Sequence, residues 1–213
     1  MVAIDGPAGS GKSTLALRLA EELGLPYVNT GVMYRALARR ALESGADPGD
    51  GPELERLLRR MAFELDRLGK PPSLLVDGAV PGDEIATPEV EGIVSIVARH
   101  PEVRRSMAAR QRELGRGGAV VEGRDIGTVV FPDAAVKVFL EASLDERAGR
   151  RIRERDGAAG VAEGLAERDL RDARVNPFVP APDAVLVDTT GKGPDEVFHQ
   201  VLRLVRGALE GTR

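Results

Sequence analysis

The feature that most constrains this chain is a glycine-rich segment at residues 6–13, which fits the pattern G-x-x-x-x-G-K-[ST]. It follows the apolar run Val2-Ala3-Ile4 and precedes apolar residues at helical spacing that end at Gly24. This context predicts a strand, a phosphate-binding loop and a helix, with backbone N–H groups and the helix N-terminus facing phosphate oxygens. We expect Lys12, in an exposed loop, to reach the β- and γ-phosphates and the Ser13 hydroxyl to ligate Mg²⁺.

The residues predicted to bind ATP are those of the loop and the first helical turn: Gly6, Pro7, Ala8, Gly9, Ser10, Gly11, Lys12, Ser13 and Thr14.

Length and composition exclude several classes of protein. The 213 residues are enough to bury a core, and 30 Lys and Arg against 34 Asp and Glu argue against binding nucleic acid or membranes through bulk positive charge. The absence of cysteine excludes disulfides, thiolate metal sites and cysteine nucleophiles. No apolar stretch approaches the roughly 18 residues of a membrane helix, and no secretory leader opens the chain. We expect a soluble, cytoplasmic protein.

The rest of the chain alternates between strand-like and helical patterns. Apolar runs at residues 27–29, 119–121, 136–140 and 184–187 predict short strands, the last three of them as candidates for central parallel strands. Two small antiparallel strands near residues 63–65 and 74–76 form an insertion, and a helix spans residues 32–42. The Arg/Glu/Asp-rich stretch 145–174 is predicted to be a helical, mobile flap. The fold class is α/β, with a mostly parallel, doubly wound sheet.

The phosphate loop alone leaves the chemistry open. The guanine-specific Asn-Lys-x-Asp segment of GTPases is absent, and the nearest candidate for the acidic strand end of motor ATPases, Val120-Val121-Glu122, carries one acid. Arginines recur beside turns and helix starts, and arginine suits a second phosphate-bearing substrate because its planar fork binds phosphate in a bidentate manner. A small-molecule kinase is therefore favoured.

At this point the sequence closely resembles the bacterial cytidylate kinases, members of the nucleoside monophosphate (NMP) kinases, over nearly its whole length. The Gly-Arg-Asp-x-Gly-Thr-Val-Val-Phe-Pro block at residues 123–132 is highly specific. The matching segments are residues 4–12, 30–35, 94–98, 101–104, 122–133, 168–172 and 179–181.

The resemblance implies a P-loop kinase core, a small α+β NMP-binding insertion and a helical lid. The core would comprise residues 1–30, 105–144 and 176–213, the NMP-binding region residues 31–104, and the lid residues 145–175. The activity implied is transfer of the γ-phosphoryl group of ATP to CMP and dCMP, in pyrimidine nucleotide metabolism, with Mg²⁺ as cofactor. The implied partners are these small molecules, with no nucleic acid and no membrane, and the implied state is a monomer.

The resemblance also assigns site residues by type. Ser95, Arg104 and Asp125 would read the cytosine. Arg35 and Arg124 would hold the acceptor phosphate, and Arg168 with Asp172 would approach the ribose. Thr30 and Arg174 complete the residues expected to bind CMP. The catalytic residues would be Lys12, Arg124, Arg147 and Arg151, with Arg147 and Arg151 as lid arginines. Ser13 would ligate Mg²⁺, and Asp5 and Glu122 would bind its waters.

Some positions depart from the family pattern. The family often has Asp at Glu122, Ser at Thr30 and Arg at Ala86, and it has one more residue between Asp172 and the next phosphate-binding arginine. A shifted loop would let Arg174 fill that last role.

Two other readings remain open. A different P-loop kinase, acting on UMP, dephospho-coenzyme A or shikimate, would need a base if its acceptor were a hydroxyl, and Asp125 is the plausible carboxylate. A nucleotide-dependent RNA-binding module is disfavoured, since the chain is acidic and has only two Tyr and five Phe.

Overall fold

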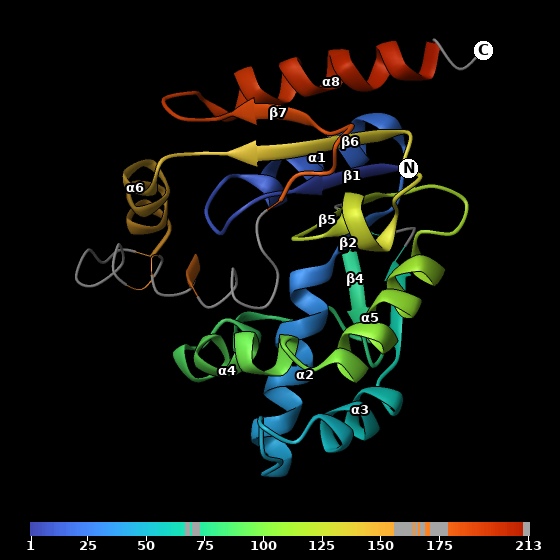
Figure 1. Ribbon diagram of the computed structural model, residues 1–213, viewed down its shortest axis with the longest axis vertical. Helices are drawn as coiled ribbons and strands as arrows, with labels where there is room; N and C mark the ends of the chain where they lie inside the picture. Colours follow the sequence, from blue (N-terminus) through green and yellow to red (C-terminus); the bar gives the residue numbers. More distant parts are fainter. Residues whose placement is uncertain are drawn as a thin grey trace.

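A five-stranded parallel sheet forms the centre of the molecule (Figure 1). The computed structural model describes residues 1–66, 69, 73–155, 164, 166, 169–170 and 179–210. The strand order is β2-β5-β1-β6-β7. The strands are β1 (Val2–Asp5), β2 (Tyr27–Asn29), β5 (Val120–Gly123), β6 (Val136–Glu141) and β7 (Val185–Asp188).

Two apolar clusters cover the two faces of this sheet because successive side chains of a strand point to opposite faces. Val2 and Ile4 of β1 belong to one cluster and Ala3 belongs to the other. The first cluster includes buried residues of α1 (Lys12–Leu23) and α8 (Pro194–Glu210). The second includes residues of α2 (Thr30–Ser44), α4 (Pro88–Ala98) and α5 (Pro101–Leu114). The layered α/β architecture confirms the predicted fold class.

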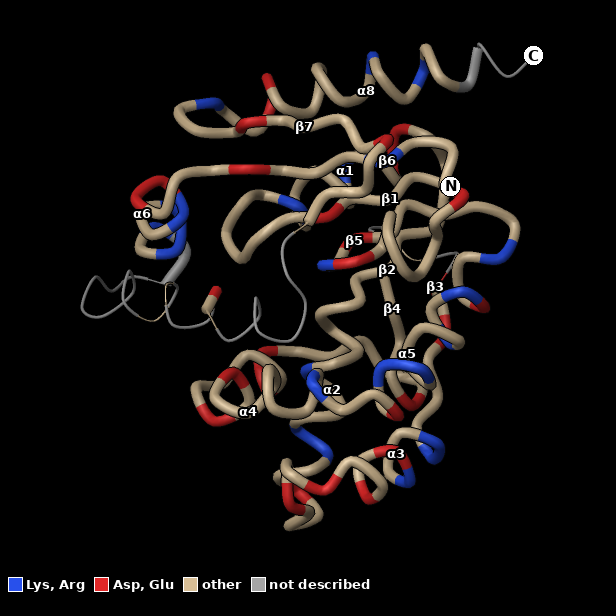
Figure 2. The backbone as a smooth tube through the Cα atoms, viewed as in Figure 1, with Lys and Arg blue, Asp and Glu red and all other residues tan. Residues whose placement is uncertain are grey.

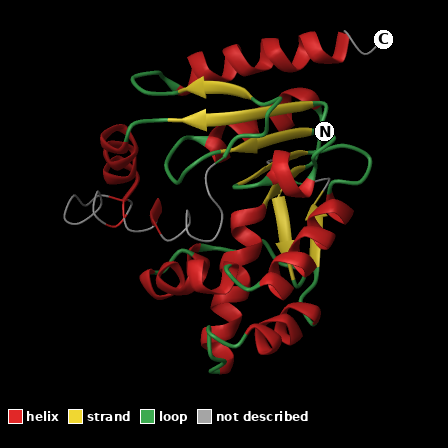
Figure 3. Cartoon of the chain, in the orientation of Figure 1, coloured by secondary structure: helices red, strands yellow, loops and turns green. Residues whose placement is uncertain are grey.

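The predicted insertion forms a separate group of elements beside the sheet (Figure 3). Its antiparallel pair consists of β3 (Phe63–Asp66) and β4 (Ser73–Val76), and it also contains α3 (Gly51–Arg59) and the 3₁₀ turn η1 (Asp83–Ile85). All five strands of the central sheet come from segments assigned to the core. The division into core, NMP-binding region and lid stays a prediction.

Helix α2 begins two residues before the predicted start at Val32. The Asn29 side chain accepts a hydrogen bond from the Val32 N–H at 3.1 Å and so caps the helix. This cap places Thr30 and Arg35 on a helix that starts directly at the carboxyl end of β2.

The prediction of a central strand at residues 184–187 is wrong. β7 lies at the edge of the sheet, and Val185 and Leu186 are 40% and 53% exposed. An apolar run of this length has the composition of a buried strand, but the strand order of the sheet decides how many neighbours it has.

The predicted flap is described only in part. Its first segment is α6 (Leu144–Arg155), and the residues between 156 and 178 other than 164, 166, 169 and 170 lie outside the described residues. In the part of the chain that the structure describes, no helix has the length and apolar character needed to cross a membrane.

Candidate active site

The phosphate loop, residues 6–11, joins β1 to α1 and depends on its glycines. Gly6, Gly9 and Gly11 have φ values of 148°, 76° and 92°, which strain any residue with a Cβ. A Cβ at Gly6 would also overlap the carbonyl oxygen of Leu140. Only glycine at these positions lets the backbone fold closely enough to present its N–H groups to a phosphate.

The sequence pattern predicted Lys12 to lie in an exposed loop, and this prediction is wrong. Lys12 is the first residue of α1 and is only 9% exposed, and its Nζ donates a hydrogen bond to the Pro7 carbonyl oxygen at 2.7 Å. The hydrogen bond ties the lysine side chain back to the phosphate loop. The ammonium group still lines the central cavity, where it can meet a phosphate.

A single cavity of about 1050 Å³ connects the phosphate loop to the insertion. It brings together most of the residues predicted for the two substrates. These are Ala8, Gly9, Ser10, Gly11, Lys12, Ser13, Thr14, Thr30, Arg35, Ser95, Arg104, Glu122, Arg124, Asp125 and Arg151. Asp5, Gly6, Pro7 and Arg147 do not line it. Arg168, Asp172 and Arg174 lie outside the described residues.

The insertion end of the cavity carries a charged pair. Arg104, in the first turns of α5, donates from Nη2 to Oδ2 of Asp125 at 2.5 Å, and Ser95 of α4 lines the same region. Tyr34 lies beside them, and burial raises the pKa of its phenol. A carboxylate, a guanidinium and a hydroxyl therefore line one cavity, and groups of these types can recognise a flat polar ring.

Two further guanidinium groups lie between this pair and the phosphate loop. Arg124 follows β5 and donates from Nη1 to the Gly6 carbonyl oxygen at 2.6 Å. Arg35 of α2 is partly buried, and this burial lowers the pKa of its guanidinium, although Glu122 and Glu91 act in the opposite direction. Both arginines line the cavity and can bind a phosphate placed between its two ends.

Asp5 supports the loop that follows β5. Its two carboxylate oxygens accept hydrogen bonds from the backbone N–H groups of Ile126 and Gly127, each at 2.8 Å. Burial raises the pKa of this carboxyl to about 6, although these two hydrogen bonds lower it. The contacts fix the start of η2 (Ile126–Val130), a short π-helical segment, and with it the position of Asp125.

The donor groups near the phosphate loop fit a magnesium ion that is shared with a nucleotide. Ser13 and Glu122 line the cavity, and Glu122 Oε1 accepts a hydrogen bond from the Tyr27 hydroxyl at 2.5 Å. Among the described residues, no group of three or more His, Asp or Glu could enclose a metal. Mg²⁺ commonly takes only one or two protein ligands beside substrate phosphates and water, so a hydroxyl and one carboxylate suffice.

Helix α6 adds a dense set of arginines (Figure 2), and the structure distributes them differently from the prediction. Arg147 is 7% exposed and donates from Nη1 to the carbonyl oxygen of Ala8 at 3.1 Å and to Asp169 at 2.5 Å. It thus packs against the phosphate loop from outside the cavity. Its predicted contact with ATP phosphates finds no support in this arrangement.

Arg150 is a candidate site residue that sequence reasoning missed. It lines the cavity together with Arg151 and Arg153, and its Nη1 would lie 3.7 Å from a Cβ built on Gly11. In the sequence, Arg150 directly precedes Arg151, which is predicted to bind ATP phosphates. This adjacent pair of arginines is the pattern that could have indicated Arg150.

The family model and the similar proteins found by comparison carry the same family description. A family model described as cytidylate kinase matches residues 2–207. The chain is 45% identical to a cytidylate kinase from Solibacter usitatus, covering 100% of this chain and 95% of the relative. It is 46% identical to one from Geobacillus kaustophilus, covering 96% and 95%.

Solved structures match at the level of the fold. A gluconokinase from Sinorhizobium meliloti superimposes with a TM-score of 0.51 at 18% identity, covering 98% of this chain and 93% of that chain. An uncharacterized protein from Eubacterium ventriosum gives the same TM-score at 13% identity, covering 97% of each chain.

Proposed function

The chain belongs to the cytidylate kinase family, and from this premise we propose that its cavity transfers the γ-phosphoryl group of ATP to CMP and dCMP. One observation carries the proposal: the phosphate loop and the Arg104–Asp125 pair line the same cavity. A triphosphate and a nucleoside monophosphate can therefore bind at once, with their phosphates directed toward one another.

ATP binds at the phosphate-loop end. Backbone N–H groups of residues 8–13 and the N-terminus of α1 face its phosphates, and Lys12 neutralises charge on the β- and γ-groups. Arg150 and Arg151 of α6 line the same cavity and add positive charge there. Mg²⁺, held by the Ser13 hydroxyl and through water by Glu122, supplies further charge neutralisation when it is bound.

CMP binds at the insertion end. Cytosine presents an amino donor at position 4 and acceptors at N3 and O2, which match the carboxylate of Asp125 and the donors of Arg104 and Ser95. Arg35 and Arg124 hold the acceptor phosphate. We also assign Thr30 to the acceptor site, because it lines the cavity and donates from Oγ1 to the Glu122 carbonyl oxygen at 2.8 Å.

The reaction needs no protein base. An oxygen of the CMP phosphate is already anionic and attacks the γ-phosphorus, while the bond from that phosphorus to the β–γ bridging oxygen breaks and ADP leaves with the electron pair. Catalysis then consists of in-line alignment and stabilisation of the charge on the transferred group. Lys12, Arg124 and Arg151 supply this charge, while Arg147 is reassigned from a phosphate ligand to a support of the loop.

Several assignments rest on the resemblance alone and stay predictions. These are the ribose and phosphate contacts of Arg168, Asp172 and Arg174, the role of Asp5 toward metal-bound water, the monomeric state and the cytoplasmic location.

A kinase for a hydroxyl acceptor is disfavoured. The carboxylate that would act as its base is Asp125, but its Oδ2 already accepts a hydrogen bond from the Arg104 guanidinium at 2.5 Å, at the insertion end of the cavity.

The deciding experiment measures ADP release from ATP with CMP, UMP, AMP or no acceptor. We expect ADP formation that depends on CMP and is slower with UMP and AMP. Equal release without any acceptor, or a higher kcat/KM for UMP or AMP than for CMP, would refute the proposal.

A further inference from the structure

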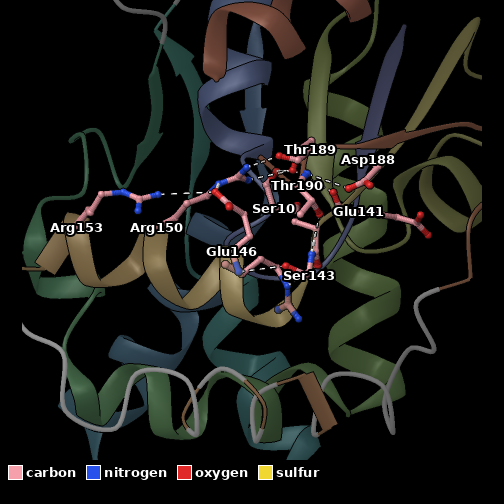
Figure 4. A network of polar contacts seen from close by, with 11 residues as sticks. Ser10, Glu141, Ser143, Glu146, Arg150, Arg153, Asp188, Thr189 and Thr190 are labelled. Atoms are coloured by element: carbon pink, nitrogen blue, oxygen red, sulfur yellow. Dashed lines mark hydrogen bonds and ion pairs between the residues drawn. The ribbon is translucent and has the colours of Figure 1, made fainter. Parts of the chain in front are cut away.

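A polar network joins α6 to the end of β7 beside the phosphate loop (Figure 4). Arg150 donates from Nη1 to Thr189 Oγ1 at 3.0 Å and from Nη2 to the Thr189 carbonyl oxygen at 2.6 Å. Its Nε donates to Glu146 Oε1, one turn earlier in the helix, at 3.0 Å. Each of the three guanidinium nitrogens thus donates one hydrogen bond, and two of the three acceptors belong to Thr189.

Thr189 is itself held in place. It is 1% exposed, and its backbone N–H donates to the Glu141 carbonyl oxygen at 2.8 Å. Its hydroxyl oxygen lies 3.0 Å from that same carbonyl oxygen and 3.3 Å from the carbonyl oxygen of Ser10 in the phosphate loop. One buried hydroxyl therefore connects the phosphate loop, the end of β6 and an arginine of α6.

We propose that Thr189 is a positioning residue for phosphoryl transfer, which holds the Arg150 guanidinium at the rim of the phosphate loop. This inference rests on the proposed function, because Arg150 would act on the phosphates of bound ATP. The distance of 3.7 Å between Arg150 Nη1 and a Cβ built on Gly11 places the cation beside the loop that binds these phosphates.

Preorganisation is the physical reason for such a residue. An arginine side chain has many rotamers, and fixing one of them during catalysis would add to the barrier. A group that holds the cation beforehand removes this entropic term and orients the fork toward charge that develops in the transition state. The carbonyl oxygen of Thr189 remains in any side-chain variant, so loss of the hydroxyl weakens the positioning without removing it.

The test compares Thr189→Val, which keeps the branched shape, with Thr189→Ser, which keeps the hydroxyl. We expect Thr189→Val to lower kcat/KM for ATP by about 5- to 30-fold, while the KM for CMP and the values for Thr189→Ser stay within about twofold of the parent. The matched control is Thr190→Val. The Thr190 hydroxyl accepts from the Ser143 N–H at 3.1 Å and is not bonded to Arg150, so this variant should also stay within about twofold.

A double-mutant comparison shows whether Thr189 acts through Arg150. We expect Arg150→Ala to lower kcat/KM for ATP by at least as much as Thr189→Val, and Thr189→Val to add less than about twofold in the Arg150→Ala background. Multiplicative effects of the two changes, or equal losses in Thr189→Val and Thr189→Ser, would overturn the proposal. A kcat/KM for ATP of Arg150→Ala within about twofold of the parent would also overturn the proposal. This measurement tests the proposal even if Thr189→Val fails to fold.

Calorimetric titration with a non-hydrolysable ATP analogue separates this inference from the proposed function. A parent protein without CMP-dependent activity would refute the function. A weaker affinity for the analogue in Thr189→Val, with unchanged affinity in Thr190→Val, would still support the positioning role. Equal affinities in these two variants would count against it.

Discussion

Arg104 and Asp125 lie 21 positions apart in the sequence, yet Nη2 of the arginine is 2.5 Å from Oδ2 of the carboxylate. The pair couples α5 to the loop after β5 at one end of the cavity. In this arrangement the arginine holds the carboxylate through Oδ2.

Asp125→Asn should narrow the preference for CMP over UMP. Uracil places a carbonyl where cytosine has its amino group, so it faces the carboxylate with repulsion and leaves a buried polar group unpaired. This costs about 1–3 kcal/mol, or roughly 5- to 150-fold. An asparagine can donate as well as accept. Steady-state kinetics with both acceptors should show lower activity on CMP and a smaller CMP:UMP ratio of kcat/KM. An unchanged ratio in both Asp125→Asn and Arg104→Met would show that these residues do not read the base.

Lys12→Ala should lower kcat by about 100-fold or more, because the ammonium neutralises charge that grows on the transferred phosphoryl group. Lys12 is buried and bonded to the Pro7 carbonyl oxygen, so we also expect a loss of about 1 kcal/mol in stability. Thermal unfolding followed by circular dichroism separates the two effects. A folded variant with turnover within about tenfold of the parent would contradict the role of the lysine.

Gly6→Ala should destabilise the protein more than Gly191→Ala. Both glycines have positive φ, 148° and 70°, so both substitutions strain the backbone. A Cβ at Gly6 would in addition overlap the Leu140 carbonyl oxygen, whereas a Cβ at Gly191 meets nothing within 4 Å. We expect a loss of about 1 kcal/mol for Gly191→Ala and about 2–4 kcal/mol for Gly6→Ala in urea unfolding. Equal losses would mean that the close approach of the loop to Leu140 is absent in solution.

Asp5 should make the folded protein less stable as the pH rises from about 4 to 6. Its pKa in the folded protein, about 6, lies above the unfolded value of 3.8, so between these values the folded state binds more protons. The contribution of Asp5 to the free energy of unfolding is therefore fully present below about pH 4. It is lost as the pH rises through 6, and the loss amounts to at most about 3 kcal/mol.

The measurement for Asp5 is the difference in unfolding free energy between the parent and Asp5→Asn from pH 4.5 to 7.5. Contributions of other carboxyls largely cancel in this difference. We expect it to decrease with rising pH. A flat or rising difference would show that burial does not govern the Asp5 carboxyl.

The sequence by itself determined the local features of the site. The spacing of glycines, lysine and serine at residues 6–13 requires one backbone shape, and the alternation of apolar runs with helical patterns specifies an α/β fold. These features follow from near neighbours in the chain, because φ preferences, capping and the two periodicities of helix and strand act over only a few residues.

Only the tertiary structure decided how these pieces face one another. Helical spacing places Arg147 and Arg151 on the same side of α6, but the docking of that helix buries Arg147 against Ala8 and leaves Arg150 and Arg151 at the cavity. Likewise, β7 lies at the edge of the sheet because it is the last strand in the order β2-β5-β1-β6-β7. Lys12 is buried in the folded protein. Arg104 contacts Asp125 because α5 lies against the loop that follows β5. Such relationships depend on packing between distant segments, and no local pattern in the chain encodes which face of an element its partner will cover.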